Sequence, residues 1–109
     1  MKLEDLAVRV LEKLGVLAAG ETAEAADLKK AQEKLVAAHA AVVARSLNRW
    51  TTHNLPVEVH EPYVSLAAVL VAPDYGRTPG GDWWIWGMSE IATAASTRIS
   101  QGAIPAEYF

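Results

Sequence analysis

The chain has 109 residues, of which 51% are hydrophobic and 21% charged, and it contains no cysteine. This length and composition allow one domain with its own hydrophobic core, and they exclude disulfides, thiolate metal sites and a cysteine nucleophile. The formal net charge is −3 at pH 7. A protein that binds the phosphates of nucleic acid needs an excess of positive charge, so this composition argues against nucleic-acid binding. The sequence shows neither an export signal nor an apolar run of membrane-spanning length, so we expect a soluble protein that stays in a reducing cytoplasm.

Apolar residues recur every three or four positions between Leu3 and Leu14, with charged residues between them. This pattern predicts an amphipathic helix over that stretch. Gly15 is expected to end the helix, because glycine adopts the left-handed cap conformation without a steric penalty and lets the following residues fold back onto the last turn.

A second and longer helix is expected from an N-cap at Thr22 to about Trp50, because neither glycine nor proline interrupts this stretch. One side of it should face the core, while the other side is rich in alanine instead of charge, which indicates that something packs closely there. The residues expected in the core stripe are Leu28, Ala31, Leu35, Ala38, Val42, Val43 and Trp50. The alanines of the other side are Ala37, Ala40, Ala41 and Ala44.

A loop with a short extended piece at Val57–Val59 should lead into a third helix. Pro62 suits the first turn of that helix, where its missing N–H does no harm. Pro73 should end it, because the residue before a proline is disfavoured in the α region. Apolar side chains occur on all sides between the two prolines, so this helix should be buried on most sides, with Leu66 and Leu70 central to the core.

A fourth helix is expected from an N-cap at Asp82 to about Gln101. Its apolar residues fall into two sets on different sides of the helix. The core stripe consists of Trp84, Met88, Ile91, Ala92, Ala95 and Ile99. Exposed tryptophans are unusual on a soluble monomer and common at protein interfaces, so we predict a subunit interface formed by Trp83, Trp86 and Glu90.

These elements predict an all-α fold, a small bundle of about four helices over residues 1–101, followed by an extended C-terminal arm over residues 102–109. Proline favours an extended conformation in the arm, and the apolar side chains of so short a tail cannot bury one another. We therefore predict that the arm docks on a partner, with folding back onto its own subunit as the alternative. The predicted docking residues are Ile104, Pro105, Tyr108 and Phe109.

The sequence contains no combination of residues that indicates catalysis, such as a nucleophile with a base or a cluster of metal ligands. The three histidines, His39, His53 and His60, lack the spacing of a metal site. His39 lies in the apolar stripe of the second helix, where we expect a hydrogen-bonded residue of the core or of an interface, a functional titrating group being the alternative. We expect no enzyme, no cofactor and no bound metal.

Three segments resemble a known family in the same order along the chain. They are LAVRVLEKLGV at residues 6–16, a long helix after a polar linker that ends in Arg49 and Trp50, and LAAVLVAPDYG at residues 66–76. In this order they resemble the head-to-tail adaptors of bacteriophages, the tail accessory or head-completion proteins that stabilise packaged DNA.

The resemblance implies a structural virion protein that is made in the host cytoplasm and lies at the head-tail interface. It would be a connector subunit of a homo-oligomeric, dodecameric ring. Such a ring binds the portal protein, extends the DNA channel and offers a platform to the next tail, stopper or tail-tube protein. Packaged DNA would pass through without sequence-specific binding, and no membrane is involved.

A second function class stays open on the residues alone. The chain could be a small helical protein-binding or regulatory module that acts as a dimer. A dimer needs one self-complementary patch, whereas a ring needs two different apolar faces, because head-to-tail contacts join unlike surfaces.

Overall fold

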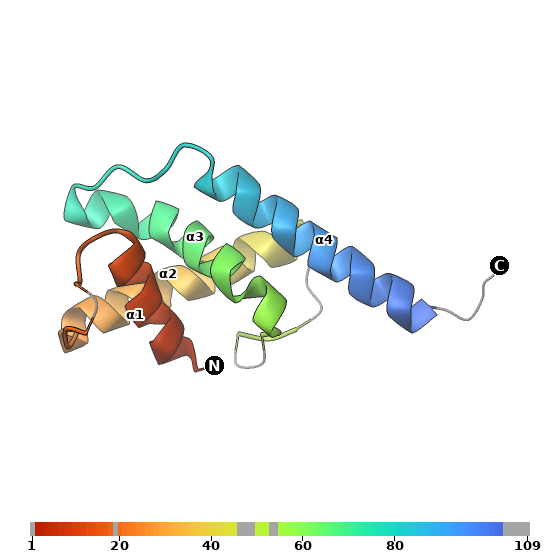
Figure 1. Ribbon diagram of the computed structural model, residues 1–109, viewed down its shortest axis with the longest axis horizontal. Helices are drawn as coiled ribbons and strands as arrows, with labels where there is room; N and C mark the ends of the chain where they lie inside the picture. Colours follow the sequence, from red (N-terminus) through yellow and green to blue (C-terminus); the bar gives the residue numbers. More distant parts are fainter. Residues whose placement is uncertain (1, 19, 46–49, 53–54, 104–109) are drawn as a thin grey trace.

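The computed structural model describes residues 2–18, 20–45, 50–52 and 55–103, with side chains as far as Ser96. Within these ranges the chain is all-α, and the predicted small bundle of about four helices is confirmed (Figure 1). The elements are α1 (Leu3–Lys13), α2 (Ala25–Ala44), the short 3-10 helix η1 (Val57–Val59), α3 (His60–Val71), a second 3-10 helix η2 (Ala72–Tyr75) and α4 (Trp83–Ala103).

Helix α3 is the centre of the fold, and α1, α2 and α4 all pack against it (Figure 1). Nine of its twelve residues are buried, which confirms the expectation that this helix is covered on most sides. Pro62 lies in its first turn, and the α-helix ends before Pro73, which begins the tighter turn of η2. A helix with hardly any solvated face needs neighbours on several sides, so α3 fixes the places of the other three.

The end of α1 follows the sequence pattern. Gly15 has a φ of 76°, a left-handed conformation that glycine adopts without strain. The N–H groups of Val16 and Leu17 both donate to the carbonyl of Leu11, at 3.0 and 3.3 Å, so the chain folds back onto the last helical turn as expected. Leu17 is thereby buried in the core.

Helix α2 is shorter than predicted at both ends. Glu24, not Thr22, occupies the N-cap position, so the predicted cap was wrong; a capping preference is about 1 kcal/mol and is easily outweighed by packing. The helix ends at Ala44, and Trp50 is not helical. Trp50 instead turns toward α3, where its Nε1–H donates to the hydroxyl of Tyr63 at 3.3 Å.

The segment Val57–Val59 forms a 3-10 helix, so the expected extended piece was wrong. The N–H of Val59 donates to the carbonyl of Pro56 at 3.1 Å, which closes a tight turn in front of α3. This turn buries Val59 fully and leaves Val57 exposed. Only Val59 therefore contributes to the core. The hydrogen bond within the turn satisfies a backbone group that, in an extended strand, would have needed a neighbouring strand as its partner.

Helix α4 starts directly after Asp82, whose carbonyl accepts the N–H of Trp86 at 2.8 Å. It continues to Ala103, two residues beyond the expected end at Gln101. Ile91 and Ala95 are buried as predicted. Gly87, one helical turn before Ile91, is buried as well.

At Gly87, α4 packs closely against α3. A Cβ atom at this position would lie 2.8 Å from Cδ2 of Leu66 and 3.0 Å from the backbone oxygen of Pro62. Both distances are shorter than van der Waals contact, so only glycine fits here without a shift of α3 or α4.

Candidate subunit interfaces

The side of α2 that points away from the core is apolar over its second half. We call this surface the α2 outer face and define it by the exposed residues Val36, Ala37, Ala40, Val43 and Ala44. Val36 and Val43 are 50% and 45% exposed, and Ala31, Leu35, Ala38 and Val42 on the opposite side are buried. Every exposed side chain between Val36 and Ala44 is apolar, which is unusual for a solvated helix face.

The position of Val43 corrects the prediction, which had placed this residue in the core. Ala37, Ala40 and Ala44 are exposed as expected, whereas Ala41 is half-buried. Because apolar residues occur around the whole circumference of the second half of α2, the sequence pattern located the core side only approximately. The alanine-rich side is nevertheless uncovered in the described part of the molecule.

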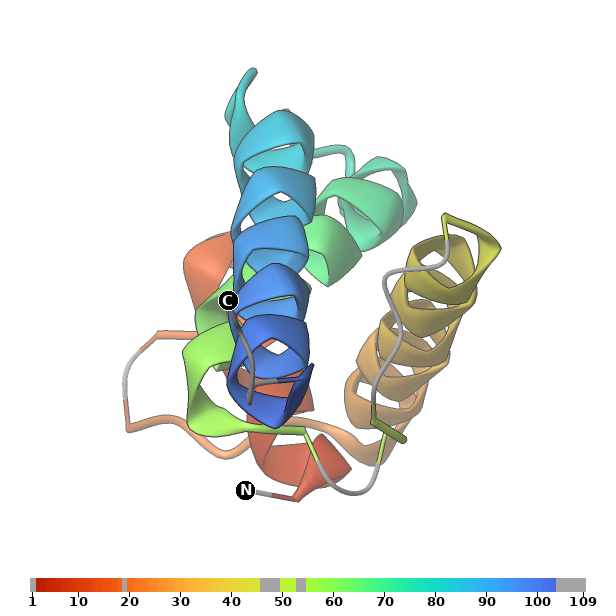
Figure 2. The same ribbon diagram turned by 90° about the vertical axis from the view of Figure 1, so that its right-hand side faces the viewer.

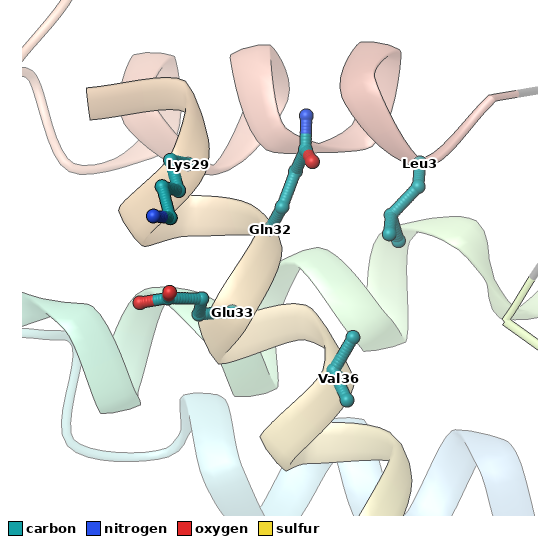
Figure 3. A pocket seen from close by; sticks show the side chains of 5 residues that line it. All are labelled: Leu3, Lys29, Gln32, Glu33 and Val36. Atoms are coloured by element: carbon teal, nitrogen blue, oxygen red, sulfur yellow. The ribbon is translucent and has the colours of Figure 1, made fainter. Parts of the chain in front are cut away.

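A shallow hollow of about 330 Å³ adjoins the α2 outer face (Figure 3). It lies between the start of α1 and the first half of α2, and its lining residues are Leu3, Lys29, Gln32, Glu33 and Val36. Val36 belongs both to the hollow and to the outer face. The hollow can accept an apolar side chain of a partner, but it holds no arrangement of groups for chemistry.

A second surface that is poor in charge lies on α4. We call it the α4 outer face and define it by Ile85 and Trp86, which are 73% and 41% exposed, together with the exposed small residues Ser89, Thr93 and Ser96. Glu90 is the only charged residue from Trp83 to Ser96, and it lies exposed at the edge of this face. Viewed along the long axis of the molecule, α2 and α4 lie apart from one another (Figure 2). The chain therefore carries two separate charge-poor surfaces.

The three residues predicted for a subunit interface do not share one environment. Trp86 and Glu90 are exposed, whereas Trp83 is half-buried and packs against the core of its own subunit. Its indole ring leaves no room for a side chain at Gly80, and the ammonium group of Lys13 lies 4.6 Å from its ring centroid. Trp84 is also half-buried, so the expected opposition of Trp83 and Trp84 is not observed.

The predicted docking residues of the arm, Ile104, Pro105, Tyr108 and Phe109, lie outside the described residues, and docking through them stays a prediction. His53 lies outside them as well. His60 is the first residue of α3 and is buried, with its Nε2 atom 3.0 Å from the carbonyl of Leu55.

His39 belongs to a hydrogen-bonded chain that joins α2, the segment after it and α3. An indole N–H can only donate, so the hydroxyl of Tyr63 accepts from Trp50 at 3.3 Å. The same hydroxyl is hydrogen-bonded to Nδ1 of His39 at 2.8 Å, and the histidine tautomer decides which of the two groups donates. Burial lowers the pKa of His39 and raises the pKa of Tyr63 to about 12. The expectation of a hydrogen-bonded histidine is confirmed.

This arrangement predicts a loss of stability in mild acid. The unfolded histidine has a pKa of 6.5, and the folded value is lower, so the unfolded state binds the proton first. The contribution of neutral His39 to the free energy of unfolding is complete above pH 6.5. It is lost as the pH falls from 6.5 to the lower pKa of the folded state. Urea unfolding at pH 7.5 and pH 5.5 measures this loss. Between these two pH values the free energy of unfolding should decrease more for the wild type than for His39→Gln. Equal decreases in the two proteins would contradict this assignment.

A second polar contact, which the sequence analysis missed, fastens η2 to the start of α2. The hydroxyl of Tyr75 donates to the carboxylate of Asp27 at 2.5 Å, and the ammonium group of Lys30 lies 5.2 Å from the centroid of the same ring. Burial, followed by the hydrogen bond to Asp27, raises the pKa of Tyr75 to about 12. An ion pair between Arg9 and Glu61 similarly joins α1 to α3. The contacts of Tyr75 therefore help to hold α2, which carries one of the outer faces, in place.

Among the residues that the structure describes, no three histidine or carboxylate side chains lie close enough together to hold a metal ion. None of the helices in the described ranges combines the length and the apolar character needed to cross a membrane. No family model matches the chain, and no curated protein or solved structure is significantly similar to it.

Proposed function

We propose that this protein is a structural subunit of a bacteriophage virion, a head-to-tail adaptor that assembles into a ring beneath the portal. The ring would extend the DNA channel and provide a platform for the next tail component. The single observation that carries this proposal is the presence of two unlike, charge-poor outer faces, one on α2 and one on α4, on a small bundle whose core is otherwise closed.

A ring subunit needs two lateral surfaces, because each subunit contacts one neighbour through one surface and the other neighbour through a different one. A small domain that worked alone would usually carry charge on the outer sides of its helices. Instead, the exposed residues from Val36 to Ala44 are all apolar, and α4 exposes Ile85 and Trp86.

Two further arguments support the adaptor. The segments at residues 6–16 and 66–76 resemble the adaptor family, and they form most of α1 with its glycine cap and the second half of α3 with η2. A net charge of −3 also suits a channel through which DNA must slide, because dense cationic charge would hold the phosphates. In this proposal the arm residues Ile104, Pro105, Tyr108 and Phe109 dock on the portal.

The alternative, a dimeric binding or regulatory module, also has an observation in its favour. The α2 outer face contains three exposed alanines, and a surface of small side chains can pack closely against a second copy of itself. Such a dimer would leave Ile85 and Trp86 without a partner in the homodimer and available to another protein.

The test is the assembly state with and without the portal protein encoded in the same genome. The purified chain, studied by native mass spectrometry and by class-averaged electron micrographs, is expected to form closed rings, alone or on the portal. Rings bound to one end of the portal, and portal-bearing heads that retain their DNA only when the chain is added, would support the adaptor. A stable dimer that never binds the portal would overturn this proposal and favour the regulatory module.

A further inference from the structure

We infer that the two outer faces are the two halves of one contact, in which the α2 outer face of one subunit receives Ile85 and Trp86 of the next subunit. The inference rests on the proposed ring and specifies how its subunits are joined. The occupant of each face is therefore a second copy of this chain, arranged head to tail.

The shapes of the two faces are complementary. The α2 outer face has Ala40 at its centre, with Val36 and Val43 beside it, so its surface is low and allows another helix to approach closely. The α4 outer face supplies the bulk that such a surface lacks, because Ile85 is 73% exposed and Trp86 is 41% exposed. Large aromatic and aliphatic side chains that meet a flat apolar surface are typical of the central part of protein interfaces.

The charges at the edges are also complementary. Arg45 follows the α2 outer face and is exposed, and its guanidinium donates to the carbonyl of Ala41 at 3.4 Å. Glu90 lies one helical turn after Trp86 at the edge of the α4 outer face and is exposed. Contact between unlike faces can bring this cation and this carboxylate together. Pairing of two α4 outer faces would place Glu90 near its own copy, which is unfavourable.

Neither face can be covered by the described part of its own subunit. Helices α2 and α4 both pack on α3 with their buried sides, and their outer faces point away from it. Because the two faces differ, two subunits joined by one contact still have one α2 outer face and one α4 outer face without a partner. Only closure into a ring gives every face a partner, whereas contacts between like faces would end at a dimer.

Two blocked variants test this pairing. Ala40→Glu places a carboxylate at the centre of the α2 outer face, and Trp86→Glu does the same on the α4 outer face; both positions are exposed, so both variants should fold with wild-type circular dichroism. Each variant alone is expected to be monomeric. An equimolar mixture is expected to form a one-to-one heterodimer by native mass spectrometry, because one intact face of each kind remains.

The matched control is Ala26→Glu, the same substitution at another exposed position of α2, which is expected to keep the wild-type ring. A second measurement uses the edge charges. Arg45→Glu and Glu90→Arg should each reduce the fraction of protein in rings, and the double variant should restore it.

The outcomes separate this inference from the proposed function. Wild-type rings in both blocked variants would overturn the inference and leave the adaptor function standing. Homodimers of either blocked variant would show pairing between like faces and would also overturn it. A wild-type chain that forms no ring and binds no portal would overturn the proposed function itself.

Discussion

Replacement of Leu66 with alanine is expected to lower the free energy of unfolding by about 2–5 kcal/mol, a large part of the ~5–15 kcal/mol that stabilises a typical domain. Leu66 is fully buried in α3, and its side chain packs against α4 at Gly87. Removing its methyl groups leaves a cavity between helices that a closed core cannot readily fill. Urea unfolding followed by circular dichroism measures the change.

Leu70, four residues later on the same helix, provides the matched control. The sequence pattern placed it at the centre of the core, but it is only partly buried. Leu70→Ala should therefore destabilise the protein clearly less than Leu66→Ala. Equal losses for the two variants would mean that the contact between α3 and α4 is looser than described.

The variant Gly87→Ala is expected to destabilise the protein by about 1–3 kcal/mol, although alanine is the better helix former by about 1 kcal/mol. The added Cβ would lie 2.8 Å from Cδ2 of Leu66 and 3.0 Å from the oxygen of Pro62. The leucine methyl can move only within a packed core, and the backbone oxygen can move only with α3. Gly87→Leu should destabilise the protein further, as measured by its melting temperature.

Gly81→Ala is the control for this series, because a Cβ at Gly81 would meet no atom within 4 Å. It is expected to leave the melting temperature nearly unchanged. A stabilising effect of Gly87→Ala would show that helix propensity outweighs the close approach of α4 to α3, and would contradict the packing described for Gly87.

The features that could be predicted from the sequence are those set by local chemistry. Alternating leucines and charges define α1, and its end depends on one glycine with a positive φ. Pro62 and Pro73 frame α3 for reasons contained in the proline ring itself. Such features need no knowledge of distant parts of the chain, and they were correct to within a few residues.

The orientation of α2 and the surroundings of α4 depend on tertiary packing and were predicted less well. In an alanine-rich helix the sides differ little in hydrophobicity, so Val43 was assigned to the core although it is 45% exposed. Trp83 was grouped with Trp86, but the chain before α4 folds so that its ring packs over Gly80. No pattern within α4 reveals where that preceding loop lies.

The candidate interfaces were predicted in part. The alanines of α2 and the exposed Trp86 were recognised from their place on the helical pattern, whereas Ile85 was not. Gly87 was missed entirely, although a glycine inside an otherwise strong helical pattern is a signal of close packing. The network of Trp50, Tyr63 and His39 could not be predicted, because it joins residues that only the folded chain brings together.

The close approach at Gly87 has a geometric consequence for the proposed assembly. In a closed ring, the rotation from one subunit to the next equals a full turn divided by the number of subunits, and it is set by the angle between the two contacting surfaces. Those surfaces lie on α2 and α4, and both helices are positioned by α3. If the proposed ring forms, its size would therefore depend on the interior of the subunit, where Gly87 packs against Leu66 and Pro62. A bulkier residue at position 87 that the fold accommodates would then change the curvature of the ring without altering any residue on its contacting surfaces.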